Sequence, residues 1–74
     1  MEQILTEAEE YVAELVWERK SLSSGELVRL CAQQLDWKKS TTYTILKRLE
    51  RKGVLRNENG QVEALISREE YQSL

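Results

Sequence analysis

Apolar residues recur along this chain at the three- and four-residue spacing of amphipathic helices, in three successive segments. The spacing predicts helices over residues 6–19, 23–35 and about 39–52. The first two segments open with the capping-box patterns TEAE and SSGE, and only a short turn separates the second segment from the third. Gly53 follows the third segment and can adopt the left-handed conformation that ends a helix.

The third segment has two chemically different faces. Placed on a helix, its apolar stripe consists of Thr42, Ile45, Leu46 and Leu49. The opposite face carries hydroxyls and cations, namely Ser40, Thr44, Lys47 and Arg51, with Tyr43 and Arg48 on its flanks. Glu50, at the edge, is its sole carboxylate. A helix with an apolar back and a basic, hydroxyl-bearing front is the shape expected in the major groove of DNA.

Beyond the third helix the pattern changes to that of a β-hairpin. Residues 54–58 and 61–66 are predicted as short strands, and the dipeptide Asn59-Gly60 between them is a strong signal for a two-residue turn with positive φ. Leu22 is expected to add a third, minimal strand. Three helices followed by a hairpin predict a winged helix-turn-helix, a mainly α fold with a small antiparallel β-hairpin as the wing.

A fourth helix is predicted to start near the end of the sequence. Residues 67–70 form another capping-box pattern, and Tyr71 and Leu74 share one helical face. A helix of barely two turns is marginal by itself. We therefore expect residues 1–66 to form the winged-helix domain, and residues 67–74 to begin a C-terminal helix that leads, beyond Leu74, to a region that pairs with another copy.

Composition excludes several classes of function. The 74 residues contain no histidine and one cysteine, so histidine-based acid–base catalysis is excluded and no internal disulfide can form. We expect no metal site, no cofactor and no enzymatic activity, because the sequence has no cysteine cluster, glycine-rich phosphate loop or paired carboxylates in a plausible pocket. Cys31 lies on an apolar stripe and is interpreted as a small core residue. No membrane-spanning run or signal peptide is visible, so we expect a cytoplasmic protein.

Charge is unevenly distributed along the chain, although the net charge is only −2. Residues 1–37 carry net −5, residues 38–56 carry net +6 and residues 57–74 carry net −3. Because the Debye length is about 8 Å at physiological salt, a phosphate beside the third helix senses mainly the local basic segment. The distribution therefore favours a nucleic-acid-binding face over charge that is merely solvated.

Four recognisable stretches are distributed over nearly the whole chain, namely LTEAEEYVAELVW, SSGELV, DWKKSTTYTILKRLERKGVL and ISREEY. Together they resemble the penicillinase-repressor family (BlaI/MecI/CopY) of bacterial winged-helix regulators, and the pattern W-x-x-x-T-x-Y-T-x-L-x-R-L-x-x-K-G from Trp37 to Gly53 is fairly specific. The resemblance implies a homodimeric transcriptional repressor that binds dyad DNA operators of the TACA/TGTA type, upstream of β-lactam-resistance or copper-homeostasis genes. It also implies that dimerisation uses helices C-terminal to the winged domain.

The resemblance and the basic face of the third helix together assign candidate DNA contacts. Hydroxyl-bearing residues are expected to meet base edges and thymine methyl groups, and these are Ser40, Thr41, Tyr43 and Thr44. Basic residues are expected to contact phosphates, and these are Lys38, Lys39, Lys47, Arg48, Arg51 and Lys52. The sequence departs from the family pattern at Lys38, where a small residue is usual, and at Glu10, where many members have a large apolar residue.

A winged domain used for protein–protein interaction, without DNA binding, is the alternative hypothesis. The overall acidity favours it, as does the predicted wing at residues 57–61, which contains no lysine or arginine. Arg56 is the nearest basic residue that can reach a phosphate from the wing. Replacing cations on the third helix separates the two hypotheses, because only a DNA-binding domain depends on them.

Overall fold

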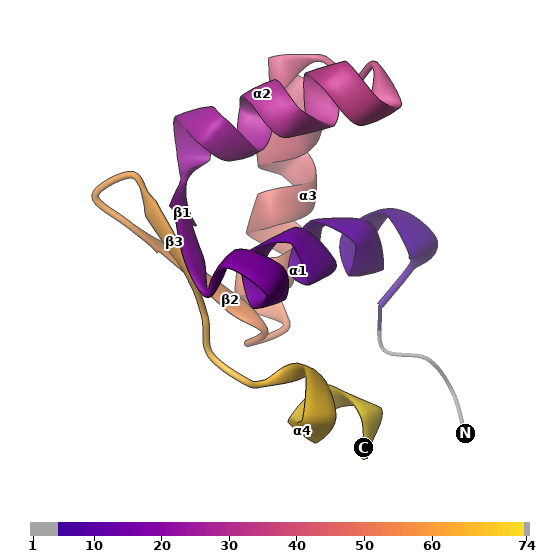
Figure 1. Cartoon of the computed structure of the whole chain (residues 1–74), viewed down its shortest axis with the longest axis vertical. Coiled ribbons are helices and arrows are strands. Elements are labelled where there is room, and N and C mark those ends of the chain that lie inside the picture. The colour runs from indigo at the N-terminus through magenta and orange to yellow at the C-terminus, as the bar shows by residue number, and fades with distance from the viewer. Residues whose placement is uncertain (1–4, 74) are drawn as a thin grey trace.

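Four helices and three short strands make up residues 5–73, the part of the chain described in the computed structural model. In chain order these elements are α1 (Glu7–Arg19), β1 (Ser21–Ser23), α2 (Ser24–Leu35), α3 (Lys39–Arg51), β2 (Leu55–Glu58), β3 (Gln61–Ala64) and α4 (Arg68–Gln72). The predicted winged helix is confirmed, with the β2–β3 hairpin extending from one side of the three helices (Figure 1). Predictions that involve residues 1–4 and Leu74 lie outside the described residues.

The strands form one antiparallel sheet in the order β1-β3-β2. The minimal strand predicted at Leu22 is confirmed, because Leu22 lies opposite Val62 and both side chains are buried. The wing turn has the predicted positive φ, 54° at Asn59 and 79° at Gly60. The hairpin strands are slightly shorter than predicted. The sheet therefore closes one side of the core and projects its turn as the wing.

Two of the three predicted capping boxes are complete. Thr6 and Ser67 each cap a helix through the reciprocal side-chain and backbone hydrogen bonds of this motif. The capping box predicted for α2 is wrong in one respect, because only one of its two reciprocal hydrogen bonds is present. Ser23 Oγ accepts the Glu26 N–H at 3.1 Å, whereas the Glu26 carboxylate lies 3.6 Å from the Arg29 guanidinium and makes no capping bond.

The core is built from aliphatic side chains of the three main helices and the sheet. Val12 and Val16 of α1, Leu46 and Leu49 of α3 and Val62 of β3 are all at most 1% exposed. Burying each such side chain stabilises the fold by about 1.5–3 kcal/mol. The apolar stripes predicted from helical spacing are thus the surfaces that bring the helices together.

Cys31 is a core residue, as its position on an apolar stripe predicted. Its side chain is fully buried in α2. Burial raises the pKa of the Cys31 thiol, and the neighbouring Thr42 hydroxyl offsets only part of that rise. A buried thiol that stays protonated is a poor nucleophile, so the residue contributes packing rather than chemistry.

The short helix α4 packs against α1 (Figure 1). Trp17 Nε1 donates a hydrogen bond to the Ile66 carbonyl at 2.9 Å, and its ring lies 5.7 Å from that of Tyr71. The Arg68 guanidinium lies 2.5 Å from the Glu14 carboxylate. These contacts, rather than its own helix propensity, hold a helix of five residues in place.

A carboxylate is buried where α1 begins and α3 ends. Glu9 is 1% exposed; its Oε1 accepts the Thr6 N–H at 3.0 Å and lies 2.6 Å from Lys52 Nζ. Burial by itself raises the pKa of Glu9. The hydrogen bonds from Lys52 and the Thr6 backbone, together with the charges of Lys52 and Arg48, outweigh burial and hold the pKa of Glu9 below its ordinary value of 4.5. The capping carboxylate is therefore also half of an ion pair that joins two helices.

The lowered pKa predicts an acid-sensitive contribution to stability. Because the folded state holds Glu9 ionised more strongly than the unfolded state, its contribution is fully present above pH 4.5 and is lost as pH falls through the lower folded-state pKa. In urea unfolding at pH 7, Glu9→Gln is expected to have a lower free energy of unfolding than the unmodified chain. This difference between the two proteins is expected to become smaller below pH 4.5. A difference in the free energy of unfolding that stays constant from pH 7 to pH 3 contradicts this prediction.

Candidate nucleic-acid interface

The helix α3 turns its apolar stripe inward and its polar face to solvent. Ile45 and Leu49 are 7% and 0% exposed, whereas Thr44 and Lys47 on the opposite side are exposed. The predicted orientation of this helix is confirmed. Since α3 contacts both α1 and the β2 strand, its outer face is presented by a rigid support rather than by a loop.

Five of the predicted phosphate-binding residues share this outer region. Lys38, Lys39, Lys47, Arg48 and Arg51 are all exposed, and within residues 5–73 none of them forms an ion pair with a carboxylate. Apart from Arg48, whose charge also acts on Glu9, their charges are available to an external anion. A cluster of unneutralised cations on one helix is the electrostatic footprint of a phosphate-binding surface.

The predicted hydroxyl contacts lie at the N-terminal half of α3. Ser40, Thr41 and Thr44 are exposed. The Thr44 hydroxyl donates to the Ser40 carbonyl at 2.9 Å, which fixes its rotamer while leaving oxygen lone pairs as acceptors. Lys38, the N-cap, makes no capping hydrogen bond with its side chain.

Tyr43 is held by contacts that spacing along the sequence does not reveal. Its hydroxyl donates to Ser24 Oγ, at the start of α2, at 3.4 Å, and Lys39 Nζ lies 6.0 Å from the centre of its ring. The side chain is half-buried, so only part of it is open to a ligand. Tyr43 thus ties the start of α3 to the start of α2.

Lys52 lies apart from the other predicted phosphate contacts. Its ammonium group points to the buried Glu9 carboxylate at the junction with α1. In this position Lys52 fixes the end of α3 from behind, whereas Lys47 and Arg51 extend from its outer face. The sequence places all three on one basic helix but does not show which of them has a buried partner.

The wing carries no unneutralised cation among its described residues. Arg56 lies 3.0 Å from Glu63 and 3.7 Å from Glu58, so its guanidinium is held by two carboxylates of the hairpin. Glu50, at the edge of α3, accepts the Asn57 N–H at 3.3 Å. That bond couples the wing to α3 and turns the Glu50 carboxylate toward the hairpin.

A model of the penicillinase repressor family matches residues 5–74. The chain belongs to the penicillinase repressor family. This family consists of DNA-binding transcription regulators and not of enzymes. A comparison with curated proteins gave no match. Family membership and the solvent-facing basic side of α3 point to the same activity, repression of transcription through DNA binding.

Residues 5–73 bring together no group of three side chains able to hold a metal ion. No helix within the same range is long and apolar enough to cross a membrane.

The different surroundings of Lys52 and Lys47 predict different effects on stability. Lys52→Ala leaves the Glu9 carboxylate buried without its cation, which is expected to lower the free energy of unfolding by on the order of 3 kcal/mol. Lys47→Ala removes an exposed cation that forms no ion pair within residues 5–73. This substitution is expected to change the free energy of unfolding by less than about 0.5 kcal/mol. Urea denaturation of both variants at pH 7 measures the difference. Equal effects contradict the structural role of Lys52.

Proposed function

We propose that the chain is the sequence-specific DNA-binding domain of a bacterial repressor, with α3 lying in the major groove of its operator. The observation that carries this proposal is the exposure, on α3 and at its N-cap, of three hydroxyl side chains and of five cations that form no ion pair within residues 5–73, while the opposite side of the helix is buried. Such a helix fits the width of the major groove, and its short side chains reach base edges.

The residues divide into two kinds of contact. Lys38, Lys39, Lys47, Arg48 and Arg51 neutralise phosphates and provide the salt-dependent part of the affinity. Ser40, Thr41, Tyr43 and Thr44 provide base and methyl contacts near the start of the helix. Lys52 forms an ion pair with Glu9 and supports the interface by fixing the angle of α3.

The operator and the assembly follow from the family resemblance. We propose a dyad operator of the TACA/TGTA type, with one winged domain, residues 1–66, on each half-site and residues 67–74 leading toward a homodimer contact after Leu74. Binding of two linked domains raises affinity well above that of one half-site. We also propose a cytoplasmic location, where a repressor can occupy promoter DNA.

The neutralised wing is the observation that favours the alternative, a protein–protein interaction module. With Arg56 paired to Glu58 and Glu63, the described residues of the hairpin offer no unpaired cation to a phosphate. In the DNA-binding proposal the wing therefore adds little affinity, and nearly all of the affinity for DNA comes from α3. The two functions differ in whether cations on α3 are needed.

Operator titration at two salt concentrations tests the DNA-binding proposal. Fluorescence anisotropy with a labelled TACA/TGTA dyad is expected to show affinity falling steeply between about 50 and 200 mM salt, with a log–log slope of roughly −4.5 per domain if each of five cations releases a counterion. Scrambled DNA of the same length is expected to bind at least about tenfold more weakly. A flat salt response, or equal binding to both duplexes, contradicts the proposal.

Charge reversal on α3 provides the matched variant. Lys47→Glu with Arg51→Glu is expected to weaken operator binding by about 100-fold or more while the circular dichroism spectrum is unchanged, because both side chains are exposed. Arg19→Glu with Lys20→Glu makes the same change in net charge at the far end of α1 and is expected to have a much smaller effect. Equal losses in both double variants would mean that only total charge matters.

A further inference from the structure

Ser24, at the start of α2, contacts both the wing turn and α3. Its backbone N–H donates to the Gly60 carbonyl at 2.8 Å, and its Oγ accepts the Tyr43 hydroxyl at 3.4 Å. A Cβ atom placed on Gly60 would lie 3.9 Å from this Oγ, so the turn of the hairpin packs beside the serine hydroxyl. One small side chain therefore lies where α2, the wing turn and α3 meet.

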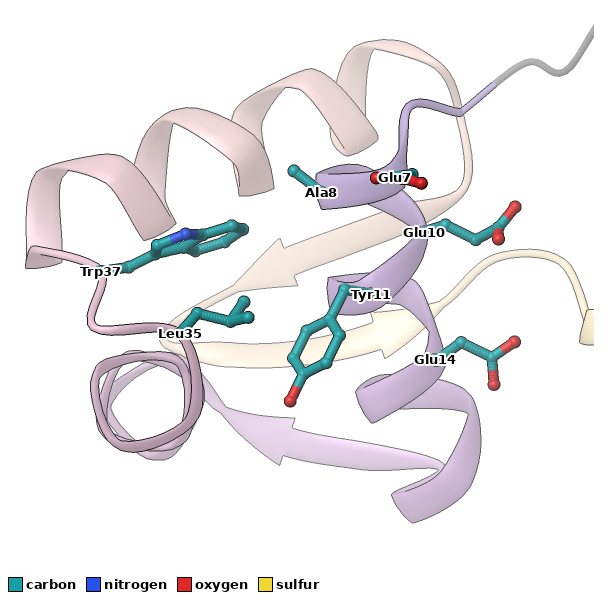
Figure 2. Close-up of a pocket in the computed structure, with 7 residues that line it drawn as sticks. All are labelled: Glu7, Ala8, Glu10, Tyr11, Glu14, Leu35 and Trp37. Atoms are coloured by element: carbon teal, nitrogen blue, oxygen red, sulfur yellow. The ribbon is translucent and has the colours of Figure 1, made fainter.

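The backbone on either side of Ser24 fixes the position of its hydroxyl. Ser23, the residue before it, caps α2 through its own Oγ, and Leu22 pairs with β3 in the sheet. At the other end of α2 a short turn leads directly into α3, and Figure 2 shows Leu35 and Trp37 at this turn. The helix α2 is thus held by the sheet at its start and by the turn at its end, which makes Ser24 Oγ a fixed hydrogen-bond acceptor.

The Tyr43 ring is restrained by packing and, at its far end, by Ser24. The ring is half-buried and packs against the hydrophobic core. Rotation about the Cβ–Cγ bond of a tyrosine has a broad energy minimum, so a hydrogen bond at the hydroxyl, the atom farthest from the backbone, restricts the ring further. Lys39 Nζ lies 6.0 Å from the centre of the same ring, so a fixed ring also gives this cation a fixed neighbour.

We propose that Ser24 is a positioning residue for DNA recognition, which acts through Tyr43 and makes no DNA contact of its own. This inference rests on the proposed function, in which Tyr43 provides a base or methyl contact. Such a contact requires the ring in one place, whereas attraction to phosphates acts over a longer range and tolerates small displacements. Loss of the Ser24 hydroxyl therefore lowers the preference for the operator and leaves the salt-dependent part of the affinity unchanged.

Operator titrations of single and double variants test the proposal. Ser24→Ala removes the hydrogen bond from one side and Tyr43→Phe removes it from the other, so their effects are expected not to add. In the unmodified background Ser24→Ala is expected to weaken binding to the TACA/TGTA dyad about threefold, as one such hydrogen bond contributes, and to leave binding to scrambled DNA unchanged. In the Tyr43→Phe background the same substitution is expected to have no further effect. The log–log salt slope is expected to stay at about −4.5, since no charge is removed.

Ser21→Ala is the matched control. It removes a hydrogen bond of the same length, from Gln61 Nε2 to Ser21 Oγ at 3.4 Å, which joins two strands of the same sheet and does not involve α3. This control is expected to leave operator affinity unchanged. An equal loss of operator affinity in Ser21→Ala and Ser24→Ala overturns the proposal.

Aromatic ¹H–¹³C spectra of the chain without DNA measure the link directly. Ser24→Ala is expected to shift the ring resonances of Tyr43 but not those of Tyr11 and Tyr71, whose hydroxyls bond to other side chains. Unchanged Tyr43 resonances overturn the proposal. So does a loss of operator affinity that persists in the Tyr43→Phe background or that is matched on scrambled DNA.

The two levels of the argument fail in different ways. If the unmodified chain shows no preference for the operator over scrambled DNA, the proposed function is contradicted and the role of Ser24 falls with it. If the unmodified chain and Ser24→Ala prefer the operator to the same degree, only the role of Ser24 is overturned.

Discussion

The ion pair between Glu9 and Lys52 is the constraint on which the geometry of this domain depends. It joins residues 43 positions apart in the sequence, at the first turn of α1 and just after the last turn of α3. Apolar side chains pack at many similar angles, but a buried carboxylate must meet its cation or lose several kcal/mol. The pair therefore fixes the end of α3 beside the start of α1, while the apolar stripe of α3 decides which of its residues face outward.

A second set of contacts fixes charged side chains at the junction of α3 and the hairpin. Glu50 stands at the edge of α3 and accepts the backbone N–H of Asn57 in the wing, which sets the direction of its carboxylate. Arg56 is likewise engaged by Glu58 and Glu63. As a result, α3 carries the positive charge, whereas the hairpin stiffens the end of α3 and does not act as a second cationic surface.

Sequence patterns predicted the elements well because those patterns are local. The 3.6-residue period gave three helices, and Asn59-Gly60 gave the hairpin turn, since each depends on neighbours within a few positions. The partners of Lys52, Tyr43 and Arg68 were not predictable in this way. Their contacts with Glu9, Ser24 and Glu14 exist only after the chain has folded, and long flexible side chains at a helix surface have several possible partners. The solvent-facing side of α3 could therefore be predicted from the sequence, whereas the supporting role of Lys52 could not.

The uneven distribution of charge also bears on how such a domain approaches DNA. A duplex attracts the basic segment of residues 38–56 and repels the acidic segments on either side of it, so a wrongly oriented encounter is disfavoured before any specific contact forms. A uniformly basic domain of the same size lacks this bias and adheres to DNA in many orientations. Because Lys52 is paired with Glu9, the basic residues of this segment that form no ion pair within residues 5–73 are the exposed ones on α3 and at its N-cap. The net negative charge of the chain is thus compatible with selective DNA binding, because the acidic segments disfavour every orientation on DNA except the productive one.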